Sequence, residues 1–474
     1  MTFVKYVPSN KTIITTRWVF AIKTDSEGNI IRFKARLVAR GFNQKFGIDF
    51  YLTFSPTLNI DCLKLIFAIA SKFKWYVHQM DIKAAYLNAN LDFDIYVTIP
   101  PGDTNFRRGY WKLNKALYGL KQSGRQWYIT LCNFLIENDF IQLKSESCIF
   151  KKVDKNKKLV CIIGIYVDDM IITGYNSDIK NIVDKIKNKF KISKSSPVDY
   201  ILGIKIENNN NVYTLSQINF INTILNKFNI NNTRQVNTPC VGDNIKSENK
   251  NPFDSTKYKS AIGMLIFLAK CTRPDIAYEV NKAARYSEHP TISDWNKVIN
   301  ILKYLNSNKN YKITYDGKGN IVAYTDADFA GDLNDRKSTS GNIILMGKNP
   351  ICWNSKKQTV VATSTAEAEY ISASLCIKKI LWIKNILFEL LNFKKPITIY
   401  TDNKASKISM ENGDLNPKLK HISIKYHFNV DNIRKNIIKL DYINSENMLA
   451  DILTKFSNSN KIKSFANQVF DNKN

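Results

Sequence analysis

Several familiar sequence signatures are missing from this chain of 474 residues. None of its 8 cysteines forms a C-x-x-C pair, and none of its 4 histidines lies at a zinc-finger spacing from a cysteine. Zinc and disulfide frameworks are therefore unexpected, and scattered free thiols are typical of a reducing, intracellular compartment. The chain also shows neither a basic-then-apolar leader nor an apolar run long enough for a membrane span, which predicts a soluble protein.

Acidic residues are few relative to basic ones. There are 69 lysines and arginines against 41 aspartates and glutamates, for a formal net charge of +28. Such an excess suits a phosphate backbone as partner, although a composition biased toward Lys and Asn would produce the same number. Hydrophobic residues at 44% and aromatic residues at 12% are typical of a globular protein. The length predicts two or three domains.

Two of the scarce acids are adjacent. Asp168 and Asp169 lie between the apolar runs 159–165 and 170–174, which have the composition of buried strands. A two-residue hairpin loop favours Asn-Gly or Asp-Gly, so an Asp-Asp pair places like charges where glycine is preferred. Ordinary turn chemistry accounts for such a pair. A metal-binding carboxylate pair accounts for it equally, but requires a third acid on a neighbouring strand.

Asp81 is the candidate for that third acid, because it lies near the end of a predicted strand. Three acids on adjacent strands can hold two Mg²⁺ ions roughly 4 Å apart, as phosphoryl transfer requires. The predicted order of elements favours a split β-α-β sheet with helices on one face. These elements are a helix at 61–73, strand 76–82, a helix from 123 to about 138, the hairpin, a helix from Asp178 and a strand at 200–206.

Blocks of sequence around these acids occur in a specific order. They are Lys34–Gly41 (KARLVARG), Phe54–Pro56 (FSP), Gln79–Asn88 (QMDIKAAYLN), Lys115–Ser123 (KALYGLKQS) and Tyr166–Asp169 (YVDD). In this order the blocks resemble the Pol proteins of copia-type LTR retrotransposons. The resemblance implies a reverse transcriptase with fingers, palm and thumb, in which Asp81, Asp168 and Asp169 are the catalytic metal ligands.

The same resemblance implies substrate-binding residues in the fingers and palm. Tyr86 is expected to be the gate that clashes with a ribose 2′-hydroxyl, with a core aromatic as the alternative. Lys34 and Arg36 are expected to hold the triphosphate, with a solvated basic strand as the alternative.

The loop before the predicted helix at 123 is expected to support the template and the incoming nucleotide. Its implied substrate-binding residues are Gly119, Lys121 and Gln122. Two positions depart from the family pattern. Gly124 stands where a proline is usual, and Ala89 replaces a common glycine.

A second group of blocks resembles the RNase H domain of the same family. These blocks are Tyr324–Asp332, Arg336–Gly341, Ser364–Tyr370, Thr401–Asn403 and Ala450–Lys455. The resemblance implies an RNase H-like α/β domain, in which four carboxylates hold two Mg²⁺ ions that activate a water against an RNA phosphodiester. The implied catalytic metal ligands are Asp326, Glu369, Asp402 and Asp451.

Glu367 competes with Glu369 for the helical position in this set. Residues two apart lie nearly opposite each other on a helix, so only one of them can face the site. Glu369 heads the more apolar stripe and is the better candidate. Asp328 and Asp332 are expected in a solvated loop. His421 and His427 are expected to be structural, so the flexible histidine of cellular RNases H is missing and the nuclease is expected to be slow.

The expected fold class is α+β, and the expected domains follow from these blocks. They are a reverse transcriptase at 1–230 with a truncated N-terminus, a linker, thumb and connection at 231–318, an RNase H-like domain at 319–458 and a polar tail at 459–474. The chain is thus expected to be the C-terminal part of a Pol polyprotein. An inactive relic that binds nucleic acid without turnover is the alternative, although all seven acids are retained.

The resemblance also implies cofactors, partners and location. Two Mg²⁺ ions are expected in each active site, with Mn²⁺ as the alternative. The expected partners are an RNA template, a DNA or tRNA-like primer, an RNA–DNA hybrid and dNTPs, with integrase or self-association as further candidates and no membrane. The expected location is the cytoplasm within a virus-like particle, or the nucleus.

Overall fold

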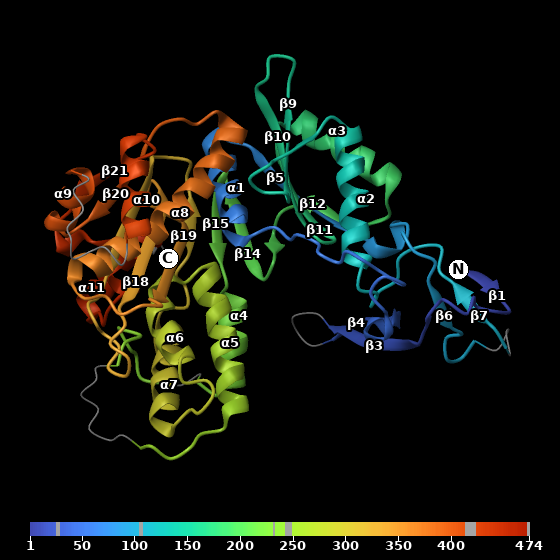
Figure 1. Ribbon diagram of the computed structural model, residues 1–474, viewed down its shortest axis with the longest axis horizontal. Coiled ribbons are helices and arrows are strands. Elements are labelled where there is room, and N and C mark those ends of the chain that lie inside the picture. Colours follow the sequence, from blue (N-terminus) through green and yellow to red (C-terminus); the bar gives the residue numbers. More distant parts are fainter. Residues whose placement is uncertain (25–28, 104–107, 231–232, 242–248, 413–422, 472–474) are drawn as a thin grey trace. The chain divides into compact units, whose positions relative to one another are not determined.

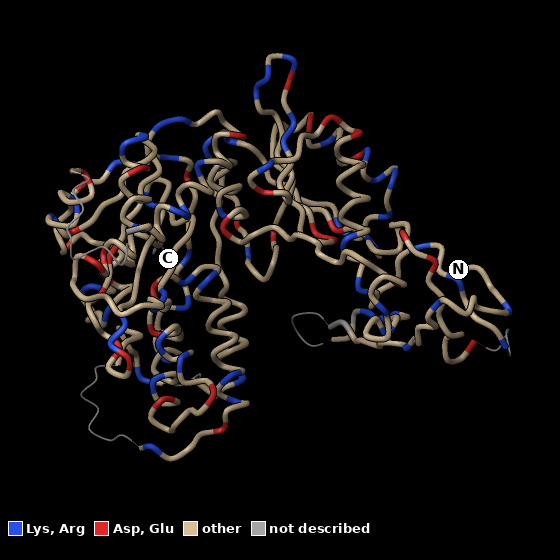
Figure 2. Tube along the Cα trace, in the orientation of Figure 1, with Lys and Arg blue, Asp and Glu red and all other residues tan. Residues whose placement is uncertain are grey.

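The computed structural model describes residues 1–24, 29–103, 108–230, 233–241, 249–412 and 423–471 (Figure 1). The chain forms two compact units: unit 1 contains residues 1–59 and 77–197, and unit 2 contains residues 60–76 and 198–474. Lysines and arginines are spread over both units and not confined to one segment (Figure 2). Within the described ranges, no helix combines the length and the apolar character needed to cross a bilayer.

Unit 1 is organised around a six-stranded sheet in the order β12-β5-β11-β10-β9-β8. Runs of β-branched residues form its central strands, and helices α2 (Ser123–Glu137) and α3 (Asn176–Lys189) supply apolar side chains to its core (Figure 1). The strands are β5 (Tyr76–Ile82), β8 (Ile141–Gln142), β9 (Ile149–Val153), β10 (Leu159–Tyr166), β11 (Asp169–Gly174) and β12 (Ile192–Pro197).

Two smaller sheets complete unit 1. One is a four-stranded sheet of β1 (Thr2–Val4), β7 (Tyr110–Lys112), β6 (Tyr96–Thr98) and β2 (Ile13–Ile14). The other is a two-stranded antiparallel ribbon of β3 (Thr16–Thr24) and β4 (Ile30–Ala39).

The base of the β3–β4 ribbon is tied to the loop before α2. The Ala39 N–H donates to the Tyr118 carbonyl at 2.8 Å. The next residue, Gly119, has a φ of +93°, and a Cβ there would collide with the Ala39 carbonyl oxygen. Only glycine therefore permits this close approach of the two backbones.

Unit 2 contains α1 (Ile60–Phe73), whereas its other elements all come from residues 198–474. A four-stranded antiparallel sheet in the order β13-β14-β15-β16 contacts α1, and helices α4 to α7 pack on one another (Figure 1). The bounds are β13 (Tyr200–Ile201), β14 (Ile204–Asn209), β15 (Val212–Ser216), β16 (Ile313–Tyr315), α4 (Ile218–Lys227), α5 (Ser255–Cys271), α6 (Ala277–Ala284) and α7 (Ile292–Ser307).

A five-stranded mixed sheet forms the rest of unit 2, in the order β19-β18-β17-β20-β21. The first three strands are antiparallel neighbours, whereas β20 and β21 run parallel to β17. The long helix α8 (Thr365–Leu391) packs against β17 and β18. The other elements are β17 (Ile321–Ala327), β18 (Thr339–Met346), β19 (Asn349–Lys357), β20 (Ile397–Thr401), β21 (Ile438–Tyr442), α9 (Lys404–Asn412), α10 (Ser423–Arg434) and α11 (Ser459–Val469).

The α+β class predicted from sequence is confirmed. The predicted strand at 200–206 is instead a tight hairpin, in which β13 and β14 pair around Leu202 and Gly203. Two further segments differ from expectation. The expected polar tail contains α11, whose Ile462 and Phe465 are buried. Its apolar residues recur at helical spacing among polar ones, so the average composition concealed an amphipathic helix. The second difference is α1, which belongs to unit 2 and not to the unit that carries Asp81.

Candidate active sites

The predicted hairpin is present in unit 1, but its turn consists of Val167 and Asp168, because Asp169 already pairs with Tyr166. Val167 has a φ of +57°, a conformation that costs free energy for a β-branched residue and must be held by its surroundings. The Trp127 indole N–H of α2 donates to the Val167 carbonyl at 2.7 Å. Packing of α2 against the sheet thus fixes the turn that carries the two acids.

Asp81 lies on β5, which is the neighbour of β11 in the sheet. The Ile82 N–H donates to the Asp168 carbonyl at 3.0 Å, so the strand pairing brings Asp81 beside the hairpin. Burial and the neighbouring Asp168 charge raise the pKa of Asp169, and a hydrogen bond from Gln79 and the charge of Lys194 partly offset this rise. A carboxylate held among like charges in this way favours a cation nearby.

The fingers and palm candidates gather around two tyrosines. The Tyr86 and Tyr118 rings lie 4.8 Å apart, and the Arg36 guanidinium lies 5.4 Å from the centre of the Tyr118 ring. Burial and the charge of Asp168 raise the pKa of Tyr86, which places its hydroxyl within electrostatic reach of the acids. Lys34 lies on the same face of β4 as Arg36, since residues two apart on a strand share a face. Tyr86, Tyr118 and Arg36 are thus brought together, with Lys34 two residues away on β4, while the substrate contacts of these residues stay a prediction.

The loop residues divide into exposed and enclosed ones. The exposed Lys121 ammonium lies 4.6 Å from the centre of the Phe50 ring. Gln122 is fully buried, and its amide bonds the Gln44 side chain at 2.9 Å and the Asp49 carbonyl at 2.8 Å. Gln122 therefore holds the loop together through its amide, and its role in substrate binding stays a prediction.

The two departures from the family pattern have little structural effect. Gly124 lies in the first turn of α2, where a Cβ would meet the Ser55 side chain at an ordinary 3.5 Å. Ala89 is fully buried in the palm core. Neither position carries a positive φ, so neither requires glycine or breaks the local fold.

The second set of acids converges at one edge of the five-stranded sheet. Asp326 is near the end of β17, Asp402 follows β20, and Asp451 lies in a 3₁₀ turn at Leu449–Leu453. One oxygen from each carboxylate lies within 4.8 Å of the others. Among the described residues, no comparable group contains Asp81, Asp168 and Asp169, so the two sites differ in how tightly their acids are gathered.

Glu369 completes the second site from α8. The Ala327 N–H donates to its Oε1 at 3.3 Å, while its Oε2 is buried without a hydrogen-bond partner. Burial, together with the charges of Asp326 and Asp402, raises the pKa of Glu369 well above its usual value. Glu367 instead accepts from the Thr363 N–H and hydroxyl at the start of α8. The arrangement thus agrees with the choice of Glu369 on helical geometry, and four convergent carboxylates suit a hard divalent cation.

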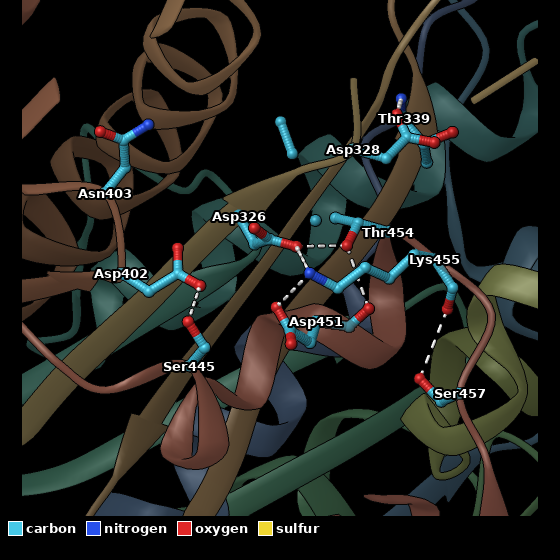
Figure 3. A network of polar contacts seen from close by, with 12 residues as sticks. Asp326, Asp328, Thr339, Asp402, Asn403, Ser445, Asp451, Thr454, Lys455 and Ser457 are labelled. Carbon is cyan, nitrogen blue, oxygen red and sulfur yellow. Dashed lines mark hydrogen bonds and ion pairs between the residues drawn. The ribbon is translucent and has the colours of Figure 1, made fainter. Parts of the chain in front are cut away.

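Residues that the sequence did not single out also enter this site (Figure 3). The Lys455 ammonium lies 3.1 Å from Asp451 and 3.8 Å from Asp326, and the Thr454 hydroxyl donates to Asp326. Ser445 donates to Asp402 at 2.8 Å. The ammonium of Lys461, on α11, also pairs with Asp451.

Of these side chains, Lys455 lines an open cleft of about 660 Å³. Its walls include Phe329, Tyr442 and Lys404 in addition to three of the acids. Lys455 ends the block Ala450–Lys455, although no role was assigned to it from sequence. Lys461 lies outside every block, and lysines are common on a basic chain.

The expectation of a solvated loop around Asp332 was wrong. This side chain is 8% exposed and pairs with Arg285 at 2.8 Å and Lys357 at 2.6 Å. Burial alone would raise its pKa, but the hydrogen bonds, led by that from Lys357, lower the pKa to about 2. Asp328 is half-buried and accepts from the Thr339 N–H, and burial raises its pKa to about 6.

Of the two histidines predicted to be structural, only His427 lies within the described residues. His427 is exposed on α10 and stacks edge-on against Tyr426. His421 lies outside the described residues.

Comparisons with known proteins place the chain in a family. Residues 1–242 match the sequence profile described as reverse transcriptase (RNA-dependent DNA polymerase). The retrovirus-related Pol polyprotein from transposon RE1 of Arabidopsis thaliana is 35% identical over 98% of this chain and 32% of its own length. That from transposon TNT 1-94 of Nicotiana tabacum is 35% identical over 96% of this chain and 35% of its own length.

A solved foamy viral protease-reverse transcriptase in complex with double-stranded DNA aligns over 93% of this chain and 66% of that chain, with 14% identity and a TM-score of 0.49. The chain spans about a third of the length of the curated relatives it matches. The predicted resemblance to copia-type Pol proteins is confirmed, and the chain belongs to the reverse transcriptase (RNA-dependent DNA polymerase) family.

Proposed function

We propose that this chain copies RNA into DNA at the site in unit 1 and cleaves the RNA of the resulting hybrid at the site in unit 2. The observation that carries the proposal is the presence, on a chain of this family, of two separate acid groups built by strand pairing. The Asp81, Asp168 and Asp169 group adjoins a tyrosine pair and a basic strand. Asp326, Glu369 and Asp402 line an open cleft, and Asp451 lies close to Asp326 and Asp402.

In unit 1, the residues are arranged for phosphoryl transfer from a dNTP to a primer. Asp81, Asp168 and Asp169 would hold two Mg²⁺ or Mn²⁺ ions, whose charge stabilises the phosphate oxygens and activates the attacking oxygen. Arg36 and Lys34 offer positive charge to the triphosphate from β4. Tyr86 stands beside Asp168, where its ring can exclude a 2′-hydroxyl. The chain supplies orientation and charge and needs no nucleophile of its own.

In unit 2, the residues are arranged for hydrolysis of an RNA strand. Asp326, Asp402, Asp451 and Glu369 would hold the cations, and the unpartnered Glu369 oxygen is directed into a site rich in negative charge. The cleft exposes Lys404, Tyr442 and Phe329, which offer a phosphate contact and ring surfaces to a nucleic acid. An RNA–DNA hybrid is therefore the proposed substrate, with an RNA template, a DNA or tRNA-like primer and dNTPs as partners of unit 1.

The test is a pair of assays on the full chain and on one variant of each site. Asp168→Asn should lower Mg²⁺-dependent primer extension by ~100-fold or more and leave hybrid cleavage intact. Asp402→Asn should lower hybrid cleavage and leave primer extension intact. The activity that each variant retains shows that its chain is folded. Equal extension by the wild type and Asp168→Asn would refute the polymerase proposal. Salt-sensitive hybrid binding without turnover at either site would identify an inactive relic.

A further inference from the structure

A buried glutamine lies next to the polymerase acids. Gln79 precedes Asp81 by two residues on β5, so both side chains project from the same face of the sheet. Gln79 is only 4% exposed. An amide buried to this extent costs free energy unless both its oxygen and its nitrogen find partners. The partners of the Gln79 amide therefore indicate its structural role.

Those contacts are Lys194 on one side and Asp169 on the other. The Lys194 ammonium donates to the Gln79 Oε1 at 3.2 Å, and hydrogen bonding from Gln79 is among the causes that lower the pKa of Asp169 on the neighbouring strand β11. An ammonium group can only donate and a carboxylate can only accept. Lys194 thus fixes the amide with its oxygen toward β12, and the NH₂ group is the one that remains for Asp169.

The strand order explains why these three residues meet. Strands β12, β5 and β11 are successive neighbours, and Lys194 of β12 lies directly opposite Asp81 of β5. Lys194 and Gln79 therefore share one face of the sheet, and Asp169 begins the next strand, β11. On the other face of β5, His78 bonds the Ser195 hydroxyl at 3.0 Å, which holds the register of the β5–β12 pair.

We propose that Gln79 and Lys194 are positioning residues for the polymerase carboxylate Asp169: the ammonium orients the amide, and the amide holds the carboxylate in the orientation that accepts a cation. This inference rests on the proposed polymerase function of unit 1. Partners outside a metal's ligand set commonly orient the ligands, and their loss typically costs about 10-fold to 100-fold in metal affinity.

Removal of either residue should weaken cation binding, but the removal of Lys194 also has an opposing charge effect. Replacing Gln79 by Leu changes no charge and removes the hydrogen bond to Asp169, so it should weaken cation binding. Replacing Lys194 by Met frees the amide to rotate, which also weakens binding. It additionally removes a positive charge beside the acids, which strengthens binding. A double-mutant cycle separates these two contributions of Lys194.

The measurement is Mn²⁺ binding to the full chain, followed by the loss of the free-ion signal in electron paramagnetic resonance. All variants carry Asp326→Asn and Asp402→Asn, so that the acid group of unit 2 contributes little. Gln79→Leu should weaken Mn²⁺ binding by about 10-fold. Lys194→Met should weaken it less, and Lys194→Arg, which keeps a donor, should restore it. Lys191→Met is the matched control, because Lys191 is exposed directly before β12.

The double-mutant cycle distinguishes the contributions of Gln79 and Lys194. In the Gln79→Leu background, Lys194→Met should no longer weaken binding, because only its charge effect remains. Unchanged Mn²⁺ binding by Gln79→Leu would overturn the inference. An equal loss from Lys194→Met in both backgrounds would remove Lys194 from it. If Asp168→Asn also binds Mn²⁺ like the parent chain, unit 1 has no cation site, and the proposed function itself fails.

Discussion

Replacing Asp61 by Asn should destabilise unit 2 far more than replacing Lys64 by Met, although the two side chains form one ion pair. Both residues lie on α1, and their charged atoms are 3.2 Å apart. The Lys64 side chain is 0% exposed, and its ammonium lies 3.6 Å above the Trp353 ring of β19. Asp61 also pairs with Lys379 of α8 at 2.8 Å, so one carboxylate serves two ammonium groups.

The magnitudes follow from what each substitution leaves behind. Without the Asp61 carboxylate, the fully buried Lys64 ammonium and the partly exposed Lys379 ammonium lose their counter-charge, which costs about 3 to 5 kcal/mol, mostly through Lys64. Without the Lys64 ammonium, Asp61 keeps Lys379, and methionine fills nearly the same volume. The lost attraction is then largely offset by the desolvation that the buried ammonium no longer requires, so the net cost is about 1 kcal/mol or less.

Thermal unfolding followed by tryptophan fluorescence measures the difference. At roughly 2 to 4 °C per kcal/mol for a unit of this size class, Asp61→Asn should lower the unit 2 midpoint by about 10 °C and Lys64→Met by about 3 °C or less. A larger loss for Lys64→Met than for Asp61→Asn would refute the reasoning.

Acid should act on the same ion pair in a defined direction. Burial raises the pKa of Asp61, but the charges of Lys64 and Lys379 outweigh burial, so the folded-state pKa lies below its usual value. The stabilisation is therefore present above the unfolded-state value of about 3.9 and is lost as the pH falls through the folded pKa. Asp61→Asn should lack this part of the acid-induced loss of stability.

Three further substitutions test other contacts. Trp127→Phe removes the donor that holds the Val167 carbonyl, so it should destabilise unit 1 by about 2 kcal/mol and reduce primer extension more than hybrid cleavage. Glu369→Gln mimics the protonated acid. Because the folded-state pKa of Glu369 is raised, its contribution to folding stability is lost as the pH rises above the unfolded-state pKa of about 4.3. In the metal-free protein, calorimetry should therefore show a higher midpoint for the variant at pH 8, and an equal midpoint there would contradict this. Lys461→Met removes an ammonium from Asp451 and should lower the Mg²⁺ concentration for half-maximal hybrid cleavage, whereas Lys463→Met, exposed on the same helix, should leave it unchanged.

Local patterns in the sequence predicted most elements, and the resemblance to copia-type Pol proteins implied both acid groups. The strand 76–82 has the predicted bounds, because apolar periodicity and flanking polar residues mark such an element directly. The positions of side chains around a helix likewise favoured Glu369 over Glu367. These are properties of neighbouring residues along the chain.

The remaining features depend on contacts between residues far apart in sequence. Asp332 is buried because Arg285 and Lys357 come to it from other elements, and no local signal distinguishes it from a loop acid. The pairing of Gln79 with Lys194 depends on the register of β5 and β12, which are separated by most of unit 1. The amphipathic α11 was concealed because its apolar residues are few and spaced among polar ones.

The membership of α1 in unit 2 has a consequence for how this protein can be divided or recombined. The backbone passes between the two units three times, at residues 59–60, 76–77 and 197–198. A fragment that starts after residue 197 would lack the helix whose Lys64 and Asp61 meet β19 and α8. The two units therefore do not behave as cassettes joined by a single linker. Exchange of the C-terminal region between related chains should succeed only when the donor region fits residues 60–76 of the recipient. A functional unit 2 therefore requires that this upstream segment and the C-terminal region come from compatible sequences.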